Sequence, residues 1–77
     1  MTLFKKKKNK QSALNFSLDR ELHHARLKKQ TSFYYPLKED EVSKSMAWGI
    51  KNRVAIEPDH ITDGLIYYKF YGYSLDF

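Results

Sequence analysis

The chain has 77 residues, of which 42% are hydrophobic and 16% aromatic, and its formal net charge is +5. A chain of this length forms one small domain, and the absence of cysteine excludes disulfides, thiolate metal sites and cysteine nucleophiles. No stretch approaches the roughly 18 apolar residues of a membrane-spanning helix, so we expect no membrane partner.

The positive charge is concentrated at the start of the chain. Residues 1–30 carry nine Lys and Arg against two acidic residues, whereas residues 31–77 carry five against seven. Residues 1–12 are rich in lysine and have little to bury, so we expect a flexible basic arm joined to a single domain, residues 13–77. This start lacks the apolar segment of a secretory signal, and the absence of cysteine suits a reducing compartment, so we expect a cytoplasmic protein.

The first predicted helix spans residues 17–30. Ser17 is a suitable N-cap, with acidic residues in the first turn and lysines in the last. Leu18, Leu22 and Ala25 recur at the i, i+4, i+7 spacing of a helix face that packs against a core.

A short strand and a second helix should follow. Residues 31–35 are β-branched and aromatic, which predicts a strand, and Pro36 ends it. The second helix is expected over residues 37–52, with Trp48 away from its buried face and a break possible near Gly49. The residues expected to be buried are Val42, Met46, Gly49 and Ile50.

Two strands joined by a tight turn should end the chain, over residues 53–62 and 65–75. The dipeptide Asp63-Gly64 is typical of a type I′ hairpin turn, because glycine accepts positive φ without steric cost. Together these elements predict an α+β fold: two helices followed by a C-terminal antiparallel β-hairpin, with residues 31–35 as a candidate third strand.

The hairpin turn also predicts the register of the two strands. It places Ile61 opposite Ile66 and Ile56 opposite Tyr71. Pro58 cannot donate a ladder hydrogen bond, so the first of the two strands should lie at a sheet edge or contain a bulge.

The last predicted strand is aromatic on both of its faces. Alternation places Leu65, Tyr67, Lys69, Tyr71 and Tyr73 on one face and Ile66, Tyr68 and Phe70 on the other. Either helices cover one face while the tyrosines of the other are solvated, or one face contacts a partner or a second copy. For the contact interpretation, the predicted partner-binding residues are Trp48, Tyr67, Tyr71 and Tyr73.

No pattern indicates catalysis or a cofactor. His23 and His24 are adjacent on the first helix and point about 100° apart, so they are poorly placed to chelate one metal ion. The acidic residues 39–41 suit the start of a helix, and the three glycines form no phosphate-binding loop. We therefore expect a protein that is not an enzyme and has no metal or cofactor.

Nucleic-acid binding is the first functional hypothesis, with DNA and RNA both open. The lysines of the arm and the basic residues of the first helix are suited to phosphate contacts, which would make binding strongly salt-dependent. The predicted contacts are Lys5, Lys6, Lys7, Lys8, Lys10, Arg20, Arg26, Lys28 and Lys29. In this hypothesis the protein is regulatory, and the hairpin serves folding or dimerisation.

The segment 37–54, LKEDEVSKSMAWGIKNRV, followed by a hairpin, resembles a winged helix-turn-helix in outline. Its apolar-small-apolar pattern is carried by Val42, Ser43, Met46, Ala47 and Val54. The resemblance implies DNA contacts by residues 51–53, although the hairpin is more aromatic and less basic than a DNA-binding wing.

The alternative hypothesis is a small inhibitor or adaptor, of the kind encoded by phages and other mobile elements. Such a protein would bind a protein target through the aromatic hairpin, whose tyrosines are typical of binding hot spots. A homodimer formed through the same aromatic face is the third interpretation of this surface.

Overall fold

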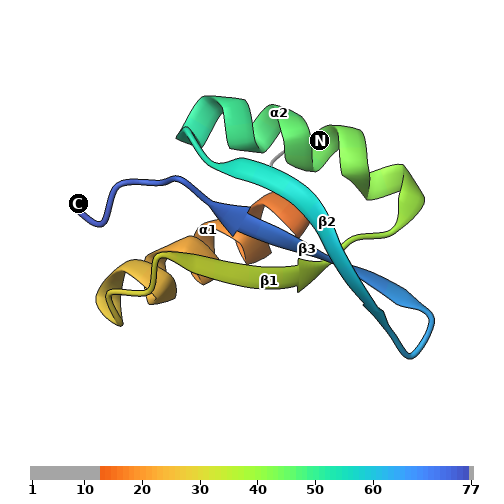
Figure 1. Cartoon of the computed structure of the whole chain (residues 1–77). Coiled ribbons are helices and arrows are strands. Elements are labelled where there is room, and N and C mark those ends of the chain that lie inside the picture. Colours follow the sequence, from red (N-terminus) through yellow and green to blue (C-terminus); the bar gives the residue numbers. More distant parts are fainter. Residues whose placement is uncertain (1–12, 77) are drawn as a thin grey trace, which may run out of the picture.

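The computed structural model describes residues 13–76, which form a two-layer α+β domain (Figure 1). The elements are α1 (Ala13–Leu27), β1 (Ser32–Pro36), the single 3-10 turn η1 (Glu39–Glu41), α2 (Val42–Asn52), β2 (Ala55–Thr62) and β3 (Leu65–Tyr71). The strands form one antiparallel sheet in the order β1-β3-β2, and both helices lie on the same face of it. The predicted fold class is confirmed, including the third strand near residues 31–35.

The core is centred on Phe70, which is fully buried in the middle strand. Phe33 of β1 stacks on it with 4.8 Å between ring centroids, and Trp48 of α2 contacts it edge-on at 6.1 Å. From α1, the core receives the apolar stripe predicted from the sequence, Leu18, Leu22 and Ala25. The helices therefore pack on the Phe70 side of the sheet.

The start of α1 differs from the prediction. The helix includes Ala13, so Ser17 lies inside it and is not an N-cap. Leu14 packs against the core one turn before Leu18. This burial favours a helical conformation for residues 13–16, which lie outside the predicted helix because Ser17 is a suitable N-cap. Asp19, predicted for the first turn, instead accepts a 2.8 Å hydrogen bond from Trp48 Nε1.

The buried face of α2 also differs from the prediction. Trp48 is only 5% exposed, whereas Ile50, expected in the core, is 82% exposed. The helix is turned so that Ser45, Trp48 and Gly49 face the interior. Burial of the indole is favourable because its N–H keeps a hydrogen-bond partner in Asp19.

Gly49 does not break α2, which continues to Asn52. A Cβ at this position would lie 2.7 Å from Val54 O and 2.9 Å from Ile56 Cδ1. Arg53 then adopts a left-handed conformation, with φ of 60°, and turns the chain towards β2. The glycine is needed because the end of α2 and the start of β2 approach each other closely.

The segment 37–54 does not form a helix-turn-helix. η1 leads directly into α2, which is the one α-helix between β1 and β2. A helix-turn-helix needs two α-helices joined by a turn. The resemblance to a winged helix is therefore limited to a helix followed by a hairpin, and residues 51–53 do not lie on a recognition helix.

The hairpin turn has the predicted conformation. Asp63 and Gly64 have φ values of 53° and 78°, and a type I′ turn requires positive φ at both positions. Ile61 lies opposite Ile66, as predicted from the two-residue loop.

The register changes at a bulge in β2. The pairing shifts between Pro58 and His60, so one extra residue enters β2 at this point. Ile56 therefore lies opposite Phe70 and not opposite Tyr71 as predicted. The expectation that Pro58 would lie on an edge strand or at a bulge is confirmed in both respects.

Gly49→Ala is expected to destabilise the fold by about 1–2 kcal/mol, although alanine favours a helix by about 1 kcal/mol. The added methyl group would have to displace the backbone oxygen of Val54. Urea unfolding monitored by circular dichroism measures the change. Ser43→Ala, at an exposed position of the same helix, is the control and should alter stability by less than about 0.5 kcal/mol. A Gly49→Ala variant at least as stable as the parent would contradict the close approach.

Candidate binding surface on the open face of the sheet

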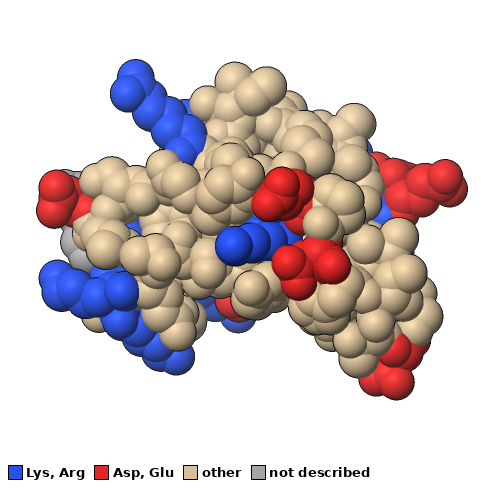
Figure 2. Space-filling view, in the orientation of Figure 1, with Lys and Arg blue, Asp and Glu red and all other residues tan. Residues whose placement is uncertain are grey.

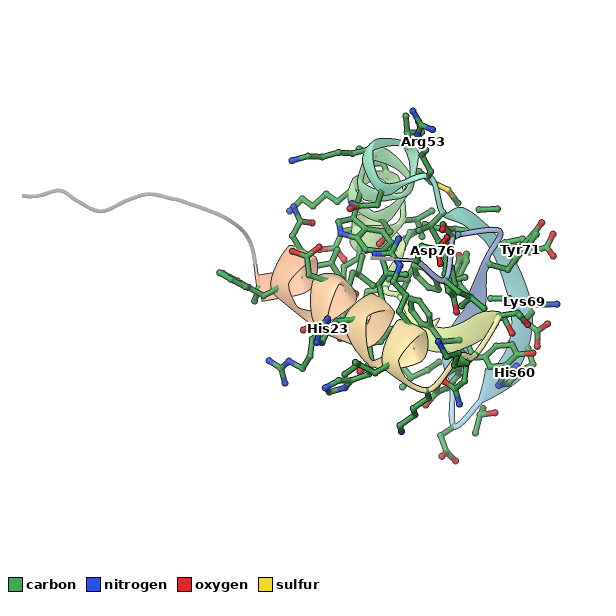
Figure 3. All side chains as sticks on the ribbon, turned by 90° about the vertical axis from the view of Figure 1, so that its left-hand side faces the viewer. His23, Arg53, His60, Lys69, Tyr71 and Asp76 are labelled. Carbon is green, nitrogen blue, oxygen red and sulfur yellow. The ribbon has the colours of Figure 1, made fainter. Side chains whose placement is uncertain are left out.

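The helices leave one face of the sheet open, and we call it the outer face. Strand alternation and register assign its members from all three strands. They are Ser32, Tyr34, Pro36, Ala55, Glu57, His60, Thr62, Leu65, Tyr67, Lys69 and Tyr71. Figure 3 shows His60, Lys69 and Tyr71 projecting from the sheet on the side away from the helices.

Three rings on the outer face form one continuous aromatic surface. His60 stacks on Tyr67, its neighbour across β2 and β3, with centroids 5.0 Å apart and ring planes 3° from parallel. Tyr34 of β1 meets the His60 ring edge-on at 5.6 Å. This surface extends from one edge strand, β1, to the other, β2. It is accessible to solvent, because Tyr34 is 47% exposed.

A second aromatic position lies further along β3. Lys69 Nζ is 5.4 Å from the centroid of the Tyr71 ring, within the range of a cation–π interaction. The residues opposite Tyr71 on the neighbouring strands are small, Ser32 and Ala55. The Tyr71 ring therefore projects further from the sheet than the side chains of its two cross-strand neighbours.

Charge on the outer face is sparse and mixed in sign. Lys69 lies between Tyr34 and Glu57 in the register. Asp59, in the bulge, is 2.7 Å from Nδ1 of His60. Figure 2 looks onto this face and shows a basic group near its centre between acidic groups, with most of the surrounding surface uncharged. An aromatic centre with few charges is typical of protein–protein interfaces.

Tyr73 does not lie on the outer face, where the sequence placed it. It is only 7% exposed and belongs to the core. β3 ends at Tyr71, and Gly72 has a φ of 80°, which interrupts the strand alternation. The Tyr73 hydroxyl donates a 2.7 Å hydrogen bond to Gln30 O. Burial raises the pKa of Tyr73 above its ordinary value of 10.0, and nearby Arg26 partly offsets this rise.

Of the other predicted partner-binding residues, Tyr67 and Tyr71 lie on the outer face and Trp48 lies in the core. The sequence did not point to Tyr34 or His60. Both come next to the β3 tyrosines only through pairing between strands, and β1 is about thirty residues away from β3 in the chain. Gly72, directly after Tyr71, is the local sequence signal for a change in backbone direction before Tyr73.

The predicted basic contacts lie on the helix side of the domain or outside its described part. Lys5, Lys6, Lys7, Lys8 and Lys10 belong to residues 1–12, which are not among the described residues. Arg20, Lys28 and Lys29 are exposed. Arg26 Nε donates a 2.8 Å hydrogen bond to Ser74 O and so attaches the C-terminal segment to α1.

Within residues 13–76, no group of three or more His, Cys, Asp or Glu side chains is placed to hold a metal ion. The rings of His23 and His24 are 6.1 Å apart and tilted by 47°. No helix in the described part of the chain has both the length and the apolar composition needed to span a bilayer.

Comparison with known proteins gave no match to any protein-family model, curated protein or solved structure. Function must therefore be inferred from the surfaces of this chain alone.

Proposed function

We propose that this protein is a non-enzymatic inhibitor or adaptor that captures a protein partner through its outer face. The observation that carries the proposal is the continuous ring surface of Tyr34, His60 and Tyr67 on a sheet face that neither helix covers. Tyrosine gives a large, rigid contact area and a polar hydroxyl, which is why it is common at binding hot spots.

The face of the sheet is better suited to a partner than either of its edges. Each edge strand contains a proline, Pro36 in β1 and Pro58 in β2. Proline has no amide hydrogen to offer to an added strand, and the bulge in β2 further disrupts that edge. We therefore expect recognition through side chains and not through strand addition.

The size of the outer face limits how a partner binds. The middle strand, β3, is about 23 Å long, and three strands spaced about 4.8 Å apart therefore form a plane of roughly 300 Å². Stable complexes bury about 800 Å² on each partner. A partner, or a second copy of this chain, must therefore reach beyond the face. At the hairpin end of the outer face Leu65 is 41% exposed, whereas Ile61 and Ile66, which are 71% and 41% exposed, lie on the opposite side of the hairpin.

Tyr34→Ala and Tyr67→Ala are each expected to weaken partner binding by about 2 kcal/mol, or roughly 30-fold, the loss typical of a hot spot. The partner is isolated on the immobilised chain, and its affinity for each variant is then measured by titration. Unfolding of each variant is monitored in parallel, because both rings lie outside the core and their removal should leave the core intact.

The matched control is Phe16→Ala, which removes an aromatic ring that is 60% exposed on α1. We expect this variant to bind as tightly as the parent chain. Equal losses for Phe16→Ala and the tyrosine variants, or full binding by both tyrosine variants, would contradict the outer face as the contact surface.

A second candidate function is nucleic-acid binding through the lysines of residues 5–10, the exposed face of α1 and the turn that follows it. It is favoured by Arg20, Lys28 and Lys29, which are exposed and have no carboxylate within 4.0 Å among residues 13–76. These side chains lie on the helix side, so the two candidate functions use different surfaces of the same domain.

For this second candidate, the full-length chain is expected to bind mixed-sequence single-stranded RNA at low salt. The logarithm of the affinity should fall linearly with the logarithm of the salt concentration, by about 0.7 for each phosphate neutralised. Removing residues 5–10, which deletes five lysines, should flatten that slope. Fluorescence anisotropy across a salt series measures both. No binding at low salt, or an unchanged slope after the deletion, would contradict a role for the arm.

A further inference from the structure

A groove of about 450 Å³ lies between α1 and α2. Cavities of this volume are within the range of ligand sites, which is about 300–1,000 Å³. Asn15 and Asp19 line it from α1, and Lys44, Lys51 and Asn52 line it from α2. The indole of Trp48, buried between the two helices, also contributes to the lining.

Lys44 and Lys51 give the groove a positive wall. They are seven residues apart and therefore lie on the same side of α2, two turns or about 10 Å along its axis. Both are exposed, and neither has a carboxylate within 4.0 Å in the described part of the chain. Their ammonium groups are consequently available to a ligand.

The other polar groups of the groove are partly used within the protein. Asp19 Oδ1 accepts the hydrogen of Trp48 Nε1 at 2.8 Å, and Asn52 Nδ2 donates to Trp48 O at 2.9 Å. The first bond holds Asp19 at the indole N–H, and the second holds Asn52 at the backbone carbonyl of Trp48. Cations still outnumber carboxylates by two to one in the lining of the groove.

We infer that this groove binds the phosphate backbone of a nucleic-acid strand, with Lys44 and Lys51 as its cationic contacts. Lysine is suited to this role because its ammonium is a compact point charge on a long, flexible stem. The groove is lined by Asn15, near the start of α1, and the lysines of residues 5–10 come just before that helix in the sequence.

This inference rests on the second candidate function and adds a site that the basic residues of the arm and α1 did not indicate. The outer face is a poorer place for phosphate. There, Glu57 lies opposite Lys69 and Asp59 contacts His60, so the acidic side chains of the described face outnumber its lysine.

The test compares two double variants of the full-length chain that lose the same net charge. Lys44→Gln with Lys51→Gln should weaken binding to single-stranded RNA about 10-fold or more at low salt and reduce the salt slope by about 1.4, the loss of two phosphate contacts. Lys38→Gln with Lys69→Gln removes two lysines outside the groove lining, and its affinity should stay within about 2-fold of the parent.

A second pair of variants removes one negative charge inside or outside the groove. Asp19→Asn should tighten RNA binding several-fold, because the amide oxygen can still accept the Trp48 hydrogen bond while the repulsion of phosphate is removed. Asp63→Asn, in the hairpin turn where asparagine tolerates positive φ, should leave the affinity unchanged.

Each other outcome overturns the inference in a recognisable way. Equal losses in the two lysine doubles would mean attraction by net charge without a site. Loss of binding on removal of residues 5–10, with no effect of Lys44→Gln and Lys51→Gln, would overturn the groove and leave the second candidate function intact. No RNA binding by the full-length chain would overturn both.

The chemical source of the phosphate is tested with inorganic phosphate as a separate probe. NMR titration of the full-length chain should show inorganic phosphate binding at least 100-fold more weakly than the RNA strand, because one anion makes few of the contacts that a strand makes. Equal affinities would identify a site for a small anion and overturn a nucleic-acid groove.

Discussion

The burial of Phe70 in the middle strand decides which side of the sheet becomes the core. Successive residues of a strand point to opposite faces, so burying Phe70 directs Tyr67, Lys69 and Tyr71 to the other side. Both helices pack on the Phe70 side, where Trp48 and the α1 stripe complete the core. The open aromatic face is thus a consequence of having one helical layer to cover a sheet that is aromatic on both sides.

Three side-chain hydrogen bonds join segments of the described domain that are far apart in the sequence. Trp48 Nε1 donates to Asp19 between the helices, the Tyr73 hydroxyl donates to Gln30 O, and Arg26 Nε donates to the carbonyl of Ser74. A net contribution of about 1 kcal/mol is typical of one such bond, which is significant for a domain with so little buried surface. The side chains with these structural roles are unsuitable as contact residues, and they include three of the predicted ones, Arg26, Trp48 and Tyr73. Function is therefore better sought on the outer face and in the groove between the helices.

Local sequence signals predicted most of the fold. Asp63-Gly64 determines the hairpin turn through residues that are adjacent, and the stripe of Leu18, Leu22 and Ala25 reflects the helical repeat. The errors arose where packing or one backbone angle decided the result. The extra residue at Asp59 shifted the register, and positive φ at Gly72 preceded the burial of Tyr73. The rotation of α2 buries Trp48, whose indole forms a tertiary bond with Asp19. The candidate surface was half predicted, because Tyr34 joins it only through long-range strand pairing.

Photo-CIDNP NMR with a flavin dye tests the central claim, that the outer face is an open aromatic surface while Trp48 and Tyr73 form the core. The method reports which Tyr, Trp and His rings a dye in solution can reach. We expect a strong Tyr34 signal, in keeping with its 47% exposure, and none from Trp48 or Tyr73, which are 5% and 7% exposed. Addition of the captured partner should abolish the Tyr34 signal. A strong Trp48 signal, or a Tyr34 signal that is absent from the free chain or unchanged by the partner, would contradict this account.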